Sequence, residues 1–158
     1  MEELTKFSIE ALKRRGVELD DIAEIVLQLQ IGYHPDLELD VCRKSVRKVL
    51  NKREVVHAIL TAINLDELTE KNLITEPLLS IIKSDEGLFG IDEIIPLSIV
   101  NIYGSIGLTN YGYLDKTKYG IIKELDESKE NCVNTFLDDI IAALAAAAAS
   151  RIAHSYIE

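Results

Sequence analysis

The sequence contains no tryptophan, only three prolines and only eight glycines in its 158 residues. Because helix-breaking residues are few and 47 % of the residues are hydrophobic, the composition is typical of a helical protein with short connections and a real core. No stretch alternates apolar and polar residues for long enough to predict a β-sheet. We therefore expect an all-α fold in one compact domain over residues 1–158, a length suited to a single core.

Cysteine and basic residues are also scarce. Cys42 and Cys132 lie far apart and lack the spacing of a metal-binding pair, so we expect reduced thiols in a cytoplasmic protein. The chain has 17 Lys and Arg against 27 Asp and Glu, a net charge of −10. This balance argues against nucleic acid as a partner and against a broad basic face for anionic lipid, since both need an excess of cations. A phosphate substrate bridged by a metal ion stays open.

Long hydrophobic runs are missing as well. The longest, at 140–149, is shorter than the roughly 20 residues that cross a bilayer. The N-terminal residues have neither the basic nor the apolar region of a signal peptide. We therefore expect a soluble protein without a transmembrane segment, although its amphipathic helices leave peripheral membrane contact open.

Apolar residues recur at helical spacing along most of the chain. This pattern predicts helices at about 4–15, 19–30, 38–50, 53–70, 77–82, 91–103, 120–125 and 135–156. The glycine-rich stretch 103–113 and the charged stretch 126–131 are expected to be loops. Because the last helix is apolar on all sides and rich in alanine, we expect it at the centre of the domain. The hydrophobic content and the basic face of the helix at 38–50 also suggest a homo-oligomer.

Two acidic pairs, Asp85-Glu86 and Asp92-Glu93, flank two glycines. The glycines favour a loop between the pairs and a helix that begins near the second pair. Four carboxylates this close repel one another unless a cation joins them, and Mg²⁺ prefers oxygen ligands. Acidic residues also stabilise the first turn of a helix, which is the alternative explanation.

A third acidic pair, Asp138-Asp139, opens the last helix. Thr135 has the position of an N-cap in a near-match to a capping box, which would explain part of this pair. Acidic pairs at two separate helix starts are harder to explain by capping alone, so the pattern favours a metal site.

Taken together, these motifs resemble the phosphatidylglycerophosphatase A family, most closely its short soluble YutG-like branch. The similarity covers residues 56–156 and leaves out the N-terminal helices at 1–52. It rests on three motifs in the family's order, namely Asp85, Gly87, Asp92 and Glu93, then Asp115 and Lys118, then Asp138 and Asp139. The resemblance implies an all-helical domain that hydrolyses a phosphate monoester with Mg²⁺ or Mn²⁺. In well-known members the substrate is phosphatidylglycerophosphate, an intermediate of phospholipid synthesis.

Carried over by position, the resemblance assigns roles to single residues. The metal ligands would be Asp92, Glu93, Asp138 and Asp139, with Asp85 nearby. Lys118 would bind the phosphate, and Asp115 would orient the phosphate or help to bind metal. Glu86 is a further candidate beside the metal. His57, which lies one residue off the apolar stripe of its helix, is either a half-buried structural histidine or a general base.

The chain also departs from the family pattern. The N-terminal Gly-Thr motif and the membrane segments are missing, Pro96 and Ala143 replace glycines, and Tyr119 replaces a proline. The expected substrate is a phosphate-bearing small molecule or a lipid headgroup. The alternative is a non-enzymatic, metal-binding or regulatory helical protein that keeps the acidic residues.

Overall fold

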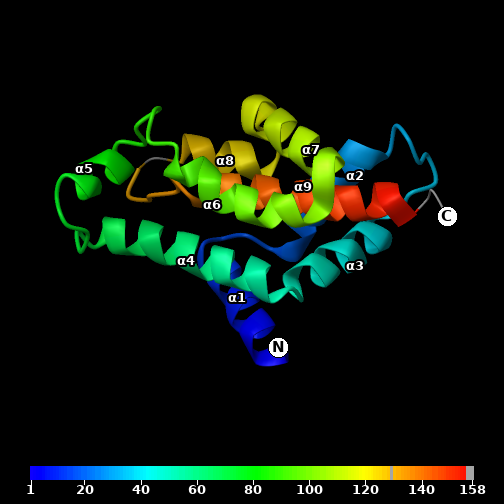
Figure 1. The fold of residues 1–158 in the computed structure, drawn as a ribbon, viewed down its shortest axis with the longest axis horizontal. Coiled ribbons are helices and arrows are strands. Elements are labelled where there is room, and N and C mark those ends of the chain that lie inside the picture. Colours follow the sequence, from blue (N-terminus) through cyan, green and yellow to red (C-terminus); the bar gives the residue numbers. More distant parts are fainter. Residues whose placement is uncertain (129, 156–158) are drawn as a thin grey trace.

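The computed structural model describes residues 1–128 and 130–155, and this part of the chain is helical without a strand (Figure 1). The prediction of an all-helical domain is confirmed. The elements are α1 (Glu2–Arg14), α2 (Leu19–Gln30), α3 (Leu39–Leu50), α4 (Arg53–Glu70), α5 (Leu78–Lys83), α6 (Ile91–Val100), the 3₁₀ helix η1 (Asn101–Tyr103), α7 (Gly104–Thr117), α8 (Ile121–Glu127) and α9 (Leu137–Ser155).

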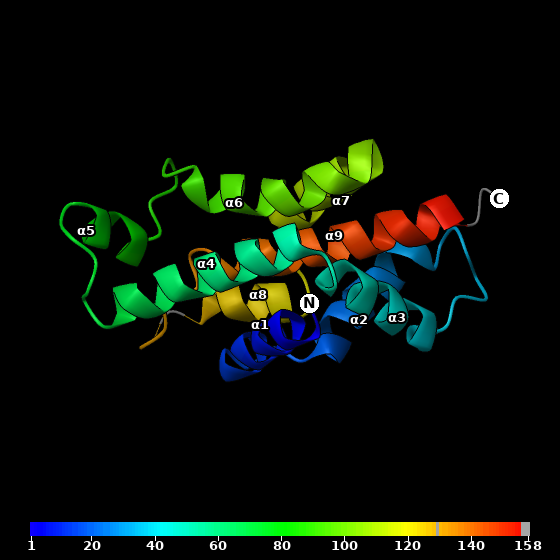
Figure 2. The same ribbon diagram turned by 60° about the horizontal axis from the view of Figure 1, so that its bottom comes forward.

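The alanine-rich helix α9 lies at the centre, as the sequence predicts. It packs against α2, α3, α4, α6, α7 and α8, and Figures 1 and 2 both show it enclosed by the other helices. All side chains at positions 137–150 are buried. Because alanine has a small side chain, neighbouring helices can approach α9 closely from every direction.

The stretch 103–113, expected to be a loop, is almost entirely helix α7, so that prediction is wrong. Its buried residues Gly107, Tyr111 and Leu114 share one face of the helix. A Cβ atom on Gly107 would lie 3.1 Å from a side-chain carbon of Val100. This glycine therefore permits close packing between α6 and α7 and does not mark a turn.

Other boundaries follow the predictions more closely. Helix α6 begins at Ile91 after Gly90, whose φ is 74°, and it contains Pro96. Helix α8 continues to Glu127, so the expected loop at 126–131 begins later than predicted. Helix α9 begins at Leu137 and is described to Ser155; position 156, where we expected its end, lies outside the described residues.

Helices α6 and α7 with η1 form the most apolar exposed segment. Ile91–Thr117 is 27 residues long, and by length and composition alone it could cross a membrane. Only 22 % of its most apolar window is buried in the fold, so most of that window is exposed. The segment breaks at Gly104, which has a φ of 74°. It therefore consists of two helices of 10 and 14 residues, each shorter than a membrane span.

Candidate functional site

Four aspartates from three helices lie within electrostatic range of one another near the start of α9. Asp138 and Asp139 begin α9 and are each only 5 % exposed. Asp92, in the first turn of α6, and Asp115, near the end of α7, are half-buried. These four aspartates, with Lys118, are called the acidic cluster below.

The charges of these aspartates act on one another. Burial raises the pKa of Asp139, and the charges of Asp138, Asp115 and Asp92 raise it further. Burial likewise raises the pKa of Asp92, with further contributions from Asp85 and Asp115. In the described structure no hydrogen bond or ion pair reaches the Asp139 carboxylate from another side chain. The carboxylates of the described cluster outnumber its cation, and the raised pKa values mean that protons offset part of their charge.

That cation is Lys118, which follows the end of α7. Its Nζ donates to Asp138 Oδ2 at 2.7 Å and to Asp126 Oδ1 at 3.3 Å. Burial alone would lower the pKa of Lys118, but the hydrogen bond and charge of Asp138, together with the charges of Asp139 and Asp126, raise it overall. The sequence pointed to Lys118 but not to Asp126, because Asp126 was assigned to a surface loop.

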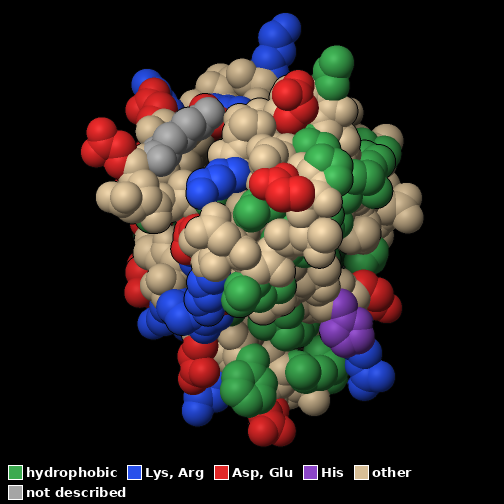
Figure 3. All heavy atoms as spheres, turned by 90° about the vertical axis from the view of Figure 1, so that its left-hand side faces the viewer, with side chains coloured by type: hydrophobic (Ala, Val, Ile, Leu, Met, Phe, Trp, Pro, Cys, Tyr) green, Lys and Arg blue, Asp and Glu red, His purple; other side chains and the backbone are tan. Residues whose placement is uncertain are grey.

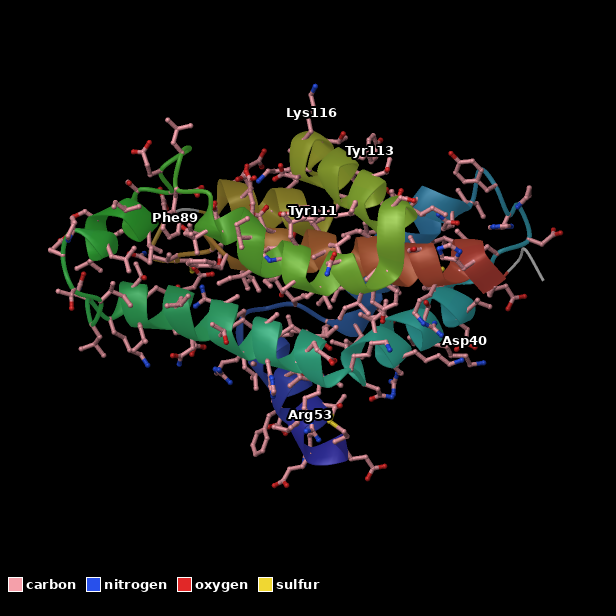
Figure 4. The ribbon with its side chains drawn as sticks, viewed as in Figure 1. Asp40, Arg53, Phe89, Tyr111, Tyr113 and Lys116 are labelled. Carbon is pink, nitrogen blue, oxygen red and sulfur yellow. The ribbon has the colours of Figure 1, made fainter. Side chains whose placement is uncertain are left out.

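Tyr111 is a member of the site that the sequence did not reveal. It is 5 % exposed, and its hydroxyl has no hydrogen-bond partner among the described residues. Figure 4 shows Tyr111 on the inner side of α7, whereas Tyr113 and Lys116 lie on its outer side. Burial raises the pKa of Tyr111, and the charges of Asp139 and Asp115 add to the rise. An unpaired buried hydroxyl beside carboxylates is the kind of group that a ligand or water satisfies.

The start of α9 is capped by a different helix, not by Thr135 as predicted. Asp66 of α4 is fully buried and accepts the N–H groups of Phe136 at 3.2 Å and Leu137 at 3.0 Å. Burial raises the pKa of Asp66 to about 8, against the opposing effect of these hydrogen bonds. The Thr135 hydroxyl instead donates to the carbonyl of Ile82. Asp138 and Asp139 are therefore not explained by a capping box.

The segment that enters α9 is fixed by a half-buried ion pair. Arg15 donates to Glu70 at 2.6 Å, to the Val133 carbonyl at 2.7 Å and to the Asn134 side chain at 3.0 Å. Glu70 also accepts the N–H of Val133 at 2.8 Å. Because Arg15 directly follows α1 and Glu70 ends α4, the N-terminal helices help to position the acidic cluster.

The loop before α6 also reaches the site. Phe89 packs edge to face on Phe136, with ring centroids 5.8 Å apart. Asp85 is half-buried and lines a cavity of about 60 Å³ together with Asp126 and Asp138. This space accommodates only a few water molecules or a group of similar size.

Three predicted site residues are more peripheral. Glu86 and Glu93 are exposed, although the charge of Glu93 reaches Tyr111. His57 is exposed on α4, about 14 Å along the helix from Asp66 at 1.5 Å per residue. Nothing in the described structure brings His57 to the acidic cluster, and it is not half-buried as one interpretation expected.

The chemistry of these residues fits a hard divalent cation. Carboxylate oxygens are the ligands that Mg²⁺ and Mn²⁺ prefer, and a bound ion would replace the protons that these carboxylates otherwise hold. As the side chains stand, no three Asp, Glu, His or Cys side chains within 1–128 and 130–155 are grouped closely enough to hold a metal ion. The donor set therefore fits such an ion in type but not, as the side chains stand, in spacing.

Comparisons with known proteins agree with the resemblance. YpjQ of Bacillus subtilis (strain 168), an uncharacterized protein, is 62 % identical over 156 residues, which cover 99 % of this chain and 88 % of YpjQ. The uncharacterized protein YutG of the same organism is 56 % identical over 143 residues, which cover 90 % of this chain and 86 % of YutG.

Solved structures show the same fold. The crystal structure of B. subtilis YpjQ has a TM-score of 0.95 at 61 % identity, covering 99 % of this chain and 96 % of that one. The low temperature requirement C protein from Listeria monocytogenes has a TM-score of 0.96 at 59 % identity, covering 98 % of each chain. The family model for phosphatidylglycerophosphatase A matches residues 9–154 and so includes most of the N-terminal helices. The chain therefore belongs to the phosphatidylglycerophosphatase A family.

Proposed function

We propose that the protein is a Mg²⁺- or Mn²⁺-dependent phosphate monoester hydrolase that uses the acidic cluster. The observation that carries this proposal is the buried Asp138-Asp139 pair, which lies within electrostatic range of Asp92, Asp115 and the unpaired Tyr111 hydroxyl and, among the described residues, has Lys118 as its ion-pair partner. Burying carboxylates without enough cations is costly and is rarely kept without a function.

The ion would be held by Asp92, Glu93, Asp138 and Asp139, with Asp85 beside them. When bound, it would compensate the carboxylates, neutralise the phosphate dianion and make water a better nucleophile at neutral pH. Asp115 is placed to orient the phosphate or to add a ligand. Glu86, being exposed, would act only through the local charge.

Lys118 and Tyr111 would act on the phosphate itself. Lys118 is bound to Asp138 in this structure, and a phosphate oxygen could replace one of its two carboxylate partners. Its charge would then stabilise the phosphoryl oxygens. The Tyr111 hydroxyl would donate a hydrogen bond to a phosphate oxygen. Because His57 is exposed on α4, we assign proton removal from water to a carboxylate of the cluster.

The substrate is a phosphate monoester, either a small molecule or a lipid headgroup. The test is a screen of phosphate release from both kinds of monoester, with Mg²⁺, with Mn²⁺ and with EDTA. We expect metal-dependent release that Asp92→Asn and Asp139→Asn each reduce at least about 100-fold, since each removes charge that the metal needs. The exposed Asp36→Asn serves as the control and should retain full activity.

Release that persists in both variants would overturn the assignment of the site. A rise in melting temperature with Mg²⁺ but no hydrolysis of any monoester would instead favour the metal-binding, non-enzymatic alternative.

A further inference from the structure

One surface of this acidic protein carries no charge. Residues 94–114 contain no Asp, Glu, Lys, Arg or His, although 28 % of all residues in the chain are charged. Six large hydrophobic side chains are exposed on this segment or just before it, namely Leu88, Ile91, Ile94, Ile102, Leu108 and Tyr113. The exposed side chains of residues 94–114 are called the neutral face below. In Figure 3, hydrophobic side chains gather on the right, which is the front of Figure 1, where α6 runs.

A face of this kind marks an interaction surface. Single exposed hydrophobic residues are ordinary, but an uncharged surface on which several of them gather indicates a binding partner or a membrane. Ile94 is 58 % exposed, Leu108 44 % and Tyr113 53 %. A groove beside α7 adds to the surface, and it is lined by Ser105 and Thr109 together with Asn110. The amide nitrogen of Asn110 is buried without a hydrogen-bond partner in the described chain.

We propose that the neutral face binds the neutral face of a second copy of this chain. In a twofold dimer, each residue near the axis meets its own copy, so a charged residue there would meet its like. Two chains that each carry a charge of −10 repel one another overall. A contact between them is therefore favoured where the surface carries no charge, and the neutral face meets that condition.

The face supplies most of the residues that a dimer interface uses. A standard interface uses about 20–30 residues and about 800 Å² from each partner. Fifteen of the residues at 94–114 are exposed or half-buried, and the exposed Leu88 and Ile91 extend this surface. The required area is about a tenth of the 8554 Å² surface of the chain. Gly104, Ser105 and Gly112 are exposed on α7, and their small size would let a facing helix approach closely.

A membrane surface fits this face less well. The neutral face is bordered by Glu93 and Asp115, and an anionic lipid surface would repel both. The break at Gly104 also prevents the two helices from forming one straight span.

Sedimentation equilibrium of the full chain tests the proposal, with Ile94→Glu and Leu108→Glu as the disrupting variants. Each places like charges opposite one another in the dimer and should weaken association at least about 100-fold. Phe7→Glu is the matched control, because Phe7 is 51 % exposed on α1 at the other side of the molecule (Figure 1). It should leave the dimer intact. Association of the native chain should strengthen between about 50 and 500 mM NaCl, because salt screens the mutual repulsion.

Four results would overturn the proposal. The first is a native chain that is monomeric at all concentrations and salt levels, and the second is an oligomer that persists in both glutamate variants. The third is loss of the dimer in Phe7→Glu to the same extent. The fourth is a monomer that floats with phosphatidylcholine vesicles and loses this binding in Ile94→Glu and Leu108→Glu. If either glutamate variant fails to fold, Leu108→Cys in a Cys132→Ser background replaces it, since Cys42 is buried. A flexible bis-maleimide should link two such chains, and a failure to link them would contradict the proposed face.

Discussion

Tyr111→Phe separates the functional role of the Tyr111 hydroxyl from any structural role. The hydroxyl is buried without a partner in the described structure, and an unpaired buried polar group costs about 1–3 kcal/mol. Phenylalanine fills nearly the same space. We therefore expect Tyr111→Phe to be more stable than the native chain by about 1 kcal/mol. For a domain of this size that gain raises the melting temperature by about 2–4 °C.

The same change should lower activity. If the hydroxyl donates to a phosphate oxygen, its removal loses a hydrogen bond to a charged group, worth about 1.5–3 kcal/mol. This corresponds to a loss in kcat/KM of about 10- to 100-fold. Urea denaturation in EDTA and phosphate release in Mg²⁺ measure the two effects on the same preparation.

Tyr103→Phe is the matched control. The Tyr103 hydroxyl is also buried without a partner in the described part of the chain, but its charged neighbours are Arg151 and Glu54 and not the acidic cluster. It should gain similar stability and keep full activity. An active Tyr111→Phe, or one that is markedly less stable than the native chain, would refute the reasoning.

The remaining predictions concern the groups that support the cluster. Asp66→Ala leaves two buried N–H groups unpaired and should lose about 2–4 kcal/mol in urea denaturation; Glu67→Ala, which removes an exposed ion pair with Arg14, should lose less than about 1 kcal/mol. The folded pKa of Asp66, about 8, lies above its ordinary value of 3.8. The folded state therefore binds the proton of Asp66 more tightly than the unfolded state does. The free energy of unfolding should fall as the pH rises from 3.8 to about 8, by up to about 1.4 kcal/mol per pH unit. In Asp66→Asn this fall should be less steep. Lys118→Met leaves Asp138 buried without its cation and should lose about 2–3 kcal/mol at pH 8 but less at pH 5, where Asp138 can take up a proton.

Much of the fold could be predicted from the sequence because local patterns determine it. The apolar stripes in the sequence predicted the first and last residues of α2, α3 and α4 closely. The alanine run indicated the central helix. The start of α6 followed from Gly90, whose positive φ favours glycine. In these segments, local preference and tertiary packing agree.

Helix α7 could not be predicted in the same way. Its glycines have two different roles, since Gly104 breaks the helix and Gly107 permits contact with Val100. Composition alone does not distinguish a glycine needed for packing from one needed for a turn. Tyr111 was missed for this reason, because it lay in the expected loop.

The site itself was partly predictable. The order of the acidic motifs pointed to Asp92, Asp115, Asp138 and Lys118; Lys118 binds Asp138, and the charges of Asp92 and Asp115 act on the neighbouring Asp139, while their roles stay predictions. Asp66 was missed, although it continues the buried stripe of Ile59 and Ile63 on α4. A carboxylate on an apolar stripe was an available signal, but its contact with α9 depends on how the two helices pack.

The most direct test of the proposed function is the rate of phosphate release at increasing Mg²⁺ concentration, for the native chain and for Asp139→Asn. We expect release by the native chain that saturates with Mg²⁺ and stops in EDTA, whereas Asp139→Asn releases almost none although it is folded and at least as stable. Release that is independent of Mg²⁺, or that Asp139→Asn retains, would contradict a catalytic metal site at the acidic cluster.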